Sequence, residues 1–120
     1  MQYVVLIYQG STPVPNRPEE WAKLSDEEQK QIYADYGKLN SNPGVTGGAP
    51  MGLPENATTV RVENGKTLTT DGPFVEMKEA VGGYFLLEAE DLDAAIEVAA
   101  GIPAARLGGA IEIRPVERYW

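Results

Sequence analysis

Asp71 is the residue whose type and position best suit chemistry in this chain. It closes a β-rich segment and stands directly before Gly72-Pro73, where a carboxylate can point into a cleft at the edge of a sheet. Desolvation there would raise its pKa toward neutrality, so that it could act as a general base. Aspartate before Gly-Pro is also a favoured turn residue whose side chain caps backbone N–H groups. Both interpretations stay open, and Asp71 is the candidate catalytic residue.

Three basic side chains stand where they could hold an anionic ligand. Arg61 and Arg114 fall in segments of strand-like composition, and Lys78 comes shortly after Asp71. Together they could bind a carboxylate or a phosphate through charge-assisted hydrogen bonds. The alternative for each is a solvated position or an ion pair with one of the many carboxylates of the chain.

Tyrosines could line a pocket, because each offers an apolar ring and a hydroxyl tip. Tyr8 and Tyr84 belong to apolar runs, whereas Tyr33 and Tyr36 stand at helical spacing. We select Tyr8 and Tyr84 as candidate ligand contacts. The alternative for all of these tyrosines is packing in the core.

A resident metal or cofactor is not expected. Asp91, Asp93 and Glu97 crowd the start of a predicted helix, where acidic residues complement the helix dipole. They have no His or Cys beside them, and their spacing matches no calcium loop. The Gly47-Gly48 and Gly82-Gly83 pairs are not followed by the helix that a phosphate-binding loop requires, so we claim no nucleotide motif.

The composition limits the chemistry further. The 120 residues include 10 Lys and Arg, 18 Asp and Glu, no His and no Cys, for a net charge of −8. The absence of Cys excludes disulfides and thiol nucleophiles, and the absence of His removes the commonest proton shuttle near neutral pH. The acidic balance argues against nucleic acids and anionic membranes as partners. No apolar run is long enough to span a bilayer, and the first eight residues lack the features of a secretion signal, so we expect a cytoplasmic protein.

The patterning predicts a single domain over residues 1–120. The apolar run Tyr3–Tyr8 is typical of a central strand buried on both faces. Ser11–Pro18 is a proline-rich connector.

Ser25 and Glu28 form a capping-box pattern at the start of a helix that should end near Leu39 or Asn40. The Gly- and Pro-rich segment 40–56 is either a long surface loop or hides a short strand at Val45–Gly48 or Met51–Leu53.

The second half of the chain begins with a strong hairpin signal. Thr58–Glu63 and Lys66–Thr70 flank Asn64-Gly65, two residues that tolerate positive φ. A third strand is expected at Tyr84–Ala89, then a helix capped by Asp91 that ends near Gly101, and a last strand at Ala110–Arg114.

This order of elements predicts an α+β fold, a ferredoxin-like sandwich with an extra hairpin. Two helices would cover one face of a four-stranded sheet and leave the other face bare. Burial of that face against a second copy would complete the core, so we expect a homodimer.

Several segments together resemble the DGPF-type branch of the YCII-related family, and they extend over nearly the whole chain. Its signature is Asp71-Gly72-Pro73-Phe74, accompanied by Glu76, Lys78 and Gly83. The segments are Ala57–Val62, Thr70–Glu79, Gly82-Gly83-Tyr84, Asp91–Ile96, Ile102–Arg106 and Ile113–Val116.

The resemblance implies a ferredoxin-like subunit that pairs as a dimeric α+β barrel, with a cavity between sheet and helices in each protomer. The wider family is known for a His-Asp pair, and this chain matches only the Asp, at Asp71. DGPF-type proteins are also associated with extracytoplasmic-function sigma factors. Two hypotheses follow. The first is a small-molecule-binding protein or cryptic enzyme with a cavity near Asp71, and the second is an accessory or regulatory protein that acts through a protein interface.

Overall fold

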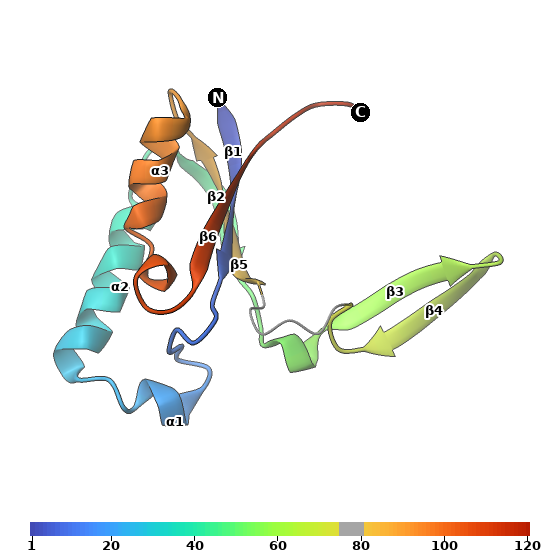
Figure 1. Ribbon diagram of the computed structural model, residues 1–120, viewed down its shortest axis with the longest axis horizontal. Coiled ribbons are helices and arrows are strands. Elements are labelled where there is room, and N and C mark those ends of the chain that lie inside the picture. The colour runs from blue at the N-terminus through green and yellow to red at the C-terminus, as the bar shows by residue number, and fades with distance from the viewer. Residues whose placement is uncertain (75–80) are drawn as a thin grey trace.

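A computed structural model describes residues 1–74 and 81–120 (Figure 1). The short 3-10 helices η1 and η2 span Pro54–Asn56 and Pro103–Ala105. The other elements, in chain order, are β1 (Gln2–Tyr8), α1 (Pro18–Trp21), α2 (Asp26–Asn40), β2 (Val45–Pro50), β3 (Thr58–Glu63), β4 (Lys66–Asp71), β5 (Val81–Glu88), α3 (Leu92–Ala100) and β6 (Ala110–Pro115).

Four strands form one antiparallel sheet in the order β2-β5-β1-β6. Helices α2 and α3 lie side by side on one face of it, and the pair β3-β4 forms a separate two-stranded sheet (Figure 1). Without the inserted hairpin, the single-turn helix α1 and the two 3-10 helices, the order is β-α-β-β-α-β, so the expected ferredoxin-like α+β fold with an extra hairpin is confirmed.

The helices begin where the sequence predicted. The Ser25 hydroxyl accepts a hydrogen bond from the Glu28 backbone N–H, and the Glu28 carboxylate accepts one from the Ser25 N–H, which is a complete capping box. The Asp91 carboxylate likewise accepts a hydrogen bond from the Ala94 N–H at the start of α3. Both caps satisfy backbone donors that have no partner within the helix.

The hydrophobic core lies between the sheet and the helices. Tyr3, Val5 and Ile7 of β1 point into it, and Leu87 of β5 and Ile102 after α3 complete its centre. The other strand positions of β1 are only half-buried. β1 is central in the sheet, as predicted. Within this chain only one of its faces is fully buried, because the described helices cover one face, and burial of the other face against a second copy stays a prediction.

Segment 40–56 holds a strand, which confirms one of the two alternatives. β2 begins at Val45 and pairs with β5 through its backbone, so Gly47 and Gly48 need no side chains to hold it there. The predicted turn at Asn64-Gly65 is also present, and both residues have positive φ, at 51° and 75°.

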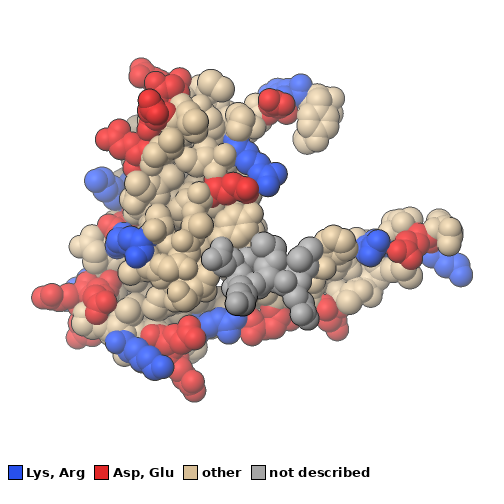
Figure 2. All heavy atoms as spheres, in the orientation of Figure 1, with Lys and Arg blue, Asp and Glu red and all other residues tan. Residues whose placement is uncertain are grey.

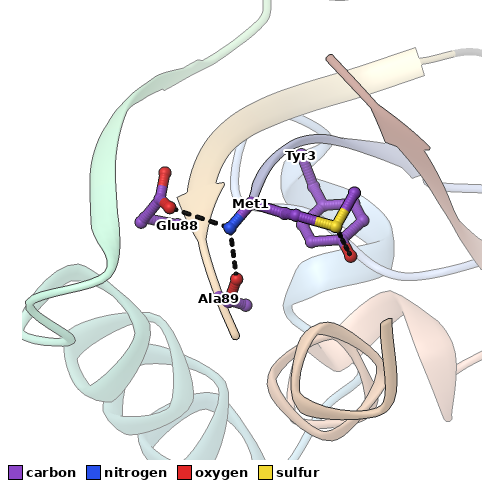
Figure 3. A network of polar contacts seen from close by, with 4 residues as sticks. All are labelled: Met1, Tyr3, Glu88 and Ala89. Carbon is purple, nitrogen blue, oxygen red and sulfur yellow. Dashed lines mark hydrogen bonds and ion pairs between the residues drawn. The ribbon is translucent and has the colours of Figure 1, made fainter. Parts of the chain in front are cut away.

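The amino end of β1 is held to the end of β5 (Figure 3). The Met1 amino group lies 2.9 Å from a carboxylate oxygen of Glu88 and donates a hydrogen bond of 2.8 Å to the Ala89 carbonyl. The Tyr3 hydroxyl is 3.7 Å from the Met1 sulfur. These contacts fix the register of the two central strands at one end of the sheet.

Substitution of Ile102 by Ala should lower the free energy of unfolding by about 2–5 kcal/mol, because this side chain is only 1% exposed and its removal leaves a cavity. Ile96→Ala on the outer face of α3, where the side chain is 49% exposed, should cost less than about 1 kcal/mol. Urea unfolding followed by circular dichroism measures both, and equal losses would contradict this placement of the core.

Candidate functional site

The structure contains a cavity of about 740 Å³ on the helix-covered side of the sheet. Its floor includes Ile7 near the end of β1 and Phe85 in the middle of β5, and Ile32 and Tyr36 of α2 form one wall. The remaining walls are the connector from Gln9 to Arg17 and the segment from Gly48 to Glu55. The lining is mostly apolar, as in small-molecule sites generally.

Gln9 is the most notable polar side chain of this cavity. β1 and β5 shift register between Ile7 and Tyr8, so that Gly82 stands opposite the end of β1 as a bulge. A Cβ on Gly82 would lie 2.2 Å from the Gln9 Cγ, so only glycine leaves room for this side chain. The Gln9 Oε1 is buried and has no hydrogen-bond partner within the described part of the chain.

Tyr36 is the polar neighbour of Gln9. Burial raises the pKa of the Tyr36 hydroxyl above its ordinary value, and the neighbouring Gln9 side chain acts in the opposite direction. At neutral pH the hydroxyl is therefore protonated. The pair offers a hydroxyl and an unused amide oxygen in mainly apolar surroundings.

Charged groups lie at the rim of the cavity. Arg17 of the connector pairs with Glu55 at 2.9 Å, and both side chains are exposed. Glu20 also lines the cavity. An exposed ion pair of this kind contributes little stability, but it joins the connector to the segment that follows β2.

Asp71 lies away from this cavity. It ends β4, its side chain is exposed, and it does not line the cavity in the described part of the chain. The nearby backbone is ordered by hydrogen bonds from the Gly72 N–H to the Ala57 carbonyl at 2.7 Å and from the Thr59 hydroxyl to the Gly72 carbonyl at 2.7 Å. The catalytic role of Asp71 stays a prediction.

Three of the predicted ligand contacts lie on one face of the sheet. Tyr8, Tyr84 and Arg114 alternate with the core residues of their strands and so point to the face that the described helices do not cover. The Tyr8 hydroxyl donates a hydrogen bond of 3.1 Å to Glu112, and the Arg114 guanidinium lies 3.2 Å from the same carboxylate. Their role as ligand contacts stays a prediction.

The remaining two candidates are elsewhere. Arg61 lies on the hairpin, where it pairs with Glu63 at 3.4 Å and stands 5.4 Å above the centre of the Phe74 ring. Arg61 is therefore not grouped with Tyr8 and Arg114 within this chain. Lys78 lies outside the described residues.

Sequence reasoning missed Gln9, Gly82 and the segment 51–55 as parts of a cavity. The length and Gly/Pro content of segment 40–56 were a signal that it is either functional or a hidden strand. Within this segment β2 runs from Val45 to Pro50, and the residues from Met51 to Glu55 form a wall of the cavity. Nothing in the sequence pattern ties Gln9 to Gly82, because the bulge that brings them together depends on strand pairing.

The described residues hold no group of three or more His, Cys, Asp or Glu placed to bind a metal. None of the described helices has the length and apolar character needed to cross a bilayer.

The sheet, its two helices and the cavity between them define a small ferredoxin-like α+β domain with a ligand-sized cavity that is open to solvent on one side. The model of the YCII-related domain matches residues 1–119, and the chain belongs to this family. The chain is 30% identical over 121 residues to the uncharacterized protein R00369 of Rhizobium meliloti (strain 1021), a match that covers 99% of this chain and 94% of that protein.

Among solved structures, the fold is similar to that of 5-chloro-2-hydroxyhydroquinone dehydrochlorinase from Burkholderia phenoliruptrix in complex with 2,5-dihydroxybenzoquinone. The TM-score is 0.50 with 15% sequence identity, over 98% of this chain and 94% of that one. At 15% identity the similarity supports a shared fold, and it does not assign the activity of the dehydrochlorinase to this chain.

Arg114→Gln should raise the pKa of Glu112 toward its ordinary value of 4.5, because the hydrogen bond from Arg114 is the largest cause that lowers this pKa, with Tyr8 contributing in the same direction. A carboxylate with a lowered pKa in the folded state stabilises the fold above its unfolded pKa, and this contribution disappears as the pH falls through the folded pKa. The stability advantage of the wild type over Arg114→Gln should therefore shrink below about pH 4.5.

Carbon-13 NMR titration of the Glu112 carboxyl measures the shift. Arg17→Gln, which removes a distant ion pair to Glu55, serves as the control and should leave Glu112 unchanged. A Glu112 pKa that does not respond to Arg114→Gln would contradict the observed hydrogen bond.

Proposed function

We propose that this protein binds a small organic molecule in the cavity between its sheet and helix α2. The observation that carries the proposal is the cavity of about 740 Å³ into which the Gln9–Tyr36 pair is built. This volume lies within the range of about 300–1,000 Å³ that is usual for ligand sites. Membership of the YCII-related family and the small molecule bound by the structural neighbour support it.

The lining suggests the chemical class of the ligand. Ile7, Ile32 and Phe85 favour a mainly apolar body. A ligand with a hydrogen-bond donor would satisfy the Gln9 Oε1, which is buried without a partner among the described residues, at a cost of about 1–3 kcal/mol. A small ring with hydroxyl or carbonyl substituents combines these properties.

The finer assignments from the sequence are part of the proposal. A cytoplasmic location, expected from the sequence on other grounds, is one of them. The Asp71-Gly72-Pro73-Phe74 signature supports the DGPF-type branch of the family, and with it pairing as a homodimer. In such a pair the open sheet face with Tyr8, Tyr84 and Arg114 would meet the second copy, so that any ligand contact by these residues would form beside the interface. Asp71 as a general base, and Arg61 and Lys78 as anion ligands, stay proposals from the sequence. Asp71 and Arg61 belong to the hairpin and do not line the cavity formed by the described residues.

The alternative function is an accessory or regulatory role beside extracytoplasmic-function sigma factors. It requires an exposed surface for a protein partner, and the exposed apolar residues of the hairpin are the observation that favours it. Co-purification of a sigma factor with the tagged full chain would support this alternative, and recovery of the chain without one would count against it.

Thermal unfolding in the presence of small-ring probes tests the binding proposal, with 2,5-dihydroxybenzoquinone and phenols of similar size as the panel. A probe at one hundred times its Kd should stabilise the protein by about 2.7 kcal/mol and raise its Tm. If no compound of the panel raises the Tm, the proposed ligand class is wrong.

Filling the cavity should abolish this effect. Gly52 lines the cavity, and apart from its chain neighbours no described atom lies within 4 Å of where its Cβ would stand. Gly52→Phe should therefore occupy the space and weaken probe binding by about tenfold or more. Gly37→Phe is the matched control, because Gly37 also has open space around it but does not line the cavity. Unchanged affinity in Gly52→Phe would place the binding site elsewhere.

A further inference from the structure

The hairpin β3–β4 stands away from the rest of the molecule as an arm, which we define as residues 58–71 (Figure 1). Every residue of β4 is exposed, and so are all but one of β3. The radius of gyration is 16.2 Å, whereas a compact chain of this length would have about 14 Å. The arm therefore lacks a packing partner within the described chain.

The two faces of the arm differ in chemistry. Side chains of paired residues share a face, and alternate residues point to opposite faces. The pairs Val60–Thr69 and Val62–Thr67 form one face along the middle and tip of the arm, and it carries no charge there. The opposite face consists of Thr59, Arg61, Glu63, Lys66, Leu68 and Thr70.

The uncharged face is costly to leave in water. Val60 is 60% exposed and Val62 is 66% exposed, although valine is among the residues most often buried. A two-stranded hairpin alone is at best marginally stable, and it normally needs a further strand or a packed face. The arm thus has the composition of an element that another surface covers.

A second unpartnered surface lies on the same chain. The open sheet face contains Val4 and Leu6 of β1 and Leu86 and Tyr84 of β5. The arm and the C-terminal segment after β6 both project on this open side (Figure 1), and the space-filling view shows a hollow between them (Figure 2). Because the arm points away from its own sheet, the two surfaces do not cover each other within one chain.

The chain carries two unpartnered surfaces that do not cover each other, and this favours a second copy as the occupant. Two chains with a net charge of −8 each repel at long range, so they can pair stably only through surfaces that carry little charge. The uncharged face of the arm and the centre of the open sheet face meet this requirement. In a two-fold pair each arm would reach the other copy, so both surfaces would be buried by one symmetric arrangement.

We infer that the Val60–Val62 face of the arm clasps a second copy of this chain and extends the contact made by the open sheet faces. This inference rests on the proposed homodimer and assigns to it a specific element. Asp71 lies at the base of the arm on the same face as Val60, opposite Thr58, so arm docking turns its carboxylate toward the second copy. The signature residue of the chain would then serve a site built by both copies.

Sedimentation equilibrium of the full chain at micromolar concentration tests the inference. The wild type should be a dimer, and Val60→Lys/Val62→Lys should raise the dimer Kd by about tenfold or more, because it places two cations in an uncharged interface. Val60→Thr/Val62→Thr keeps the β-branched shape and should give a smaller increase in the same direction. Far-UV circular dichroism should be unchanged in both variants, because these side chains lie outside the core.

Leu68→Lys is the matched control on the opposite face of the arm, where the side chain is 44% exposed. It should leave the dimer Kd within about threefold of the wild type. A dimeric wild type whose Kd is unaffected by Val60→Lys/Val62→Lys would overturn the role of the arm while the homodimer stands. A monomeric wild type would overturn both, and recovery of a sigma factor on the arm would assign it to that partner. None of these three outcomes depends on whether a probe binds in the cavity.

Discussion

The structure depends on a sheet whose central strand β1 is apolar on both faces, whereas the described helices cover only one of them. Burial of apolar surface is the dominant favourable contribution to folding, and here α2 and α3 supply it on the side of Tyr3, Val5 and Ile7. The residues between these, Val4 and Leu6, are as apolar but only half-buried. The cavity, the hairpin and the proposed pairing each follow from how the chain uses these two faces.

On the covered side, the helices do not fill the space completely. The core is packed around Leu87 and Ile102, whereas the other end of the sheet opens into the cavity. The bulge at Gly82 belongs to this end, and it admits the Gln9 side chain with a buried oxygen that no described residue satisfies. Local irregularity of this kind, beside a cavity and with an unpaired polar atom, is typical of a functional site rather than of a stabilising one.

Most of the fold could be predicted from local chemistry. The capping box at Ser25 and Glu28, the Asp91 cap and the Asn64-Gly65 turn each satisfy backbone requirements within a few residues, so their signals are present in the sequence itself. β2 was harder to predict because Gly47 and Gly48 give no side-chain pattern. The cavity could not be predicted, since it depends on how Gln9, Gly82 and segment 51–55 meet in space.

The unbroken apolar run of β1 predicts burial on both faces, and the single chain fully buries one of them. A second copy on the open face, held by the Val60–Val62 face of the arm, would reconcile the pattern with the structure. Hydrogen–deuterium exchange of the arm tests this most directly, because the amides of an uncovered hairpin exchange rapidly. Slow exchange in residues 58–71 at high protein concentration, lost on dilution, is the predicted result. Rapid exchange of the arm at every concentration, while β1 and β5 stay protected, would contradict it.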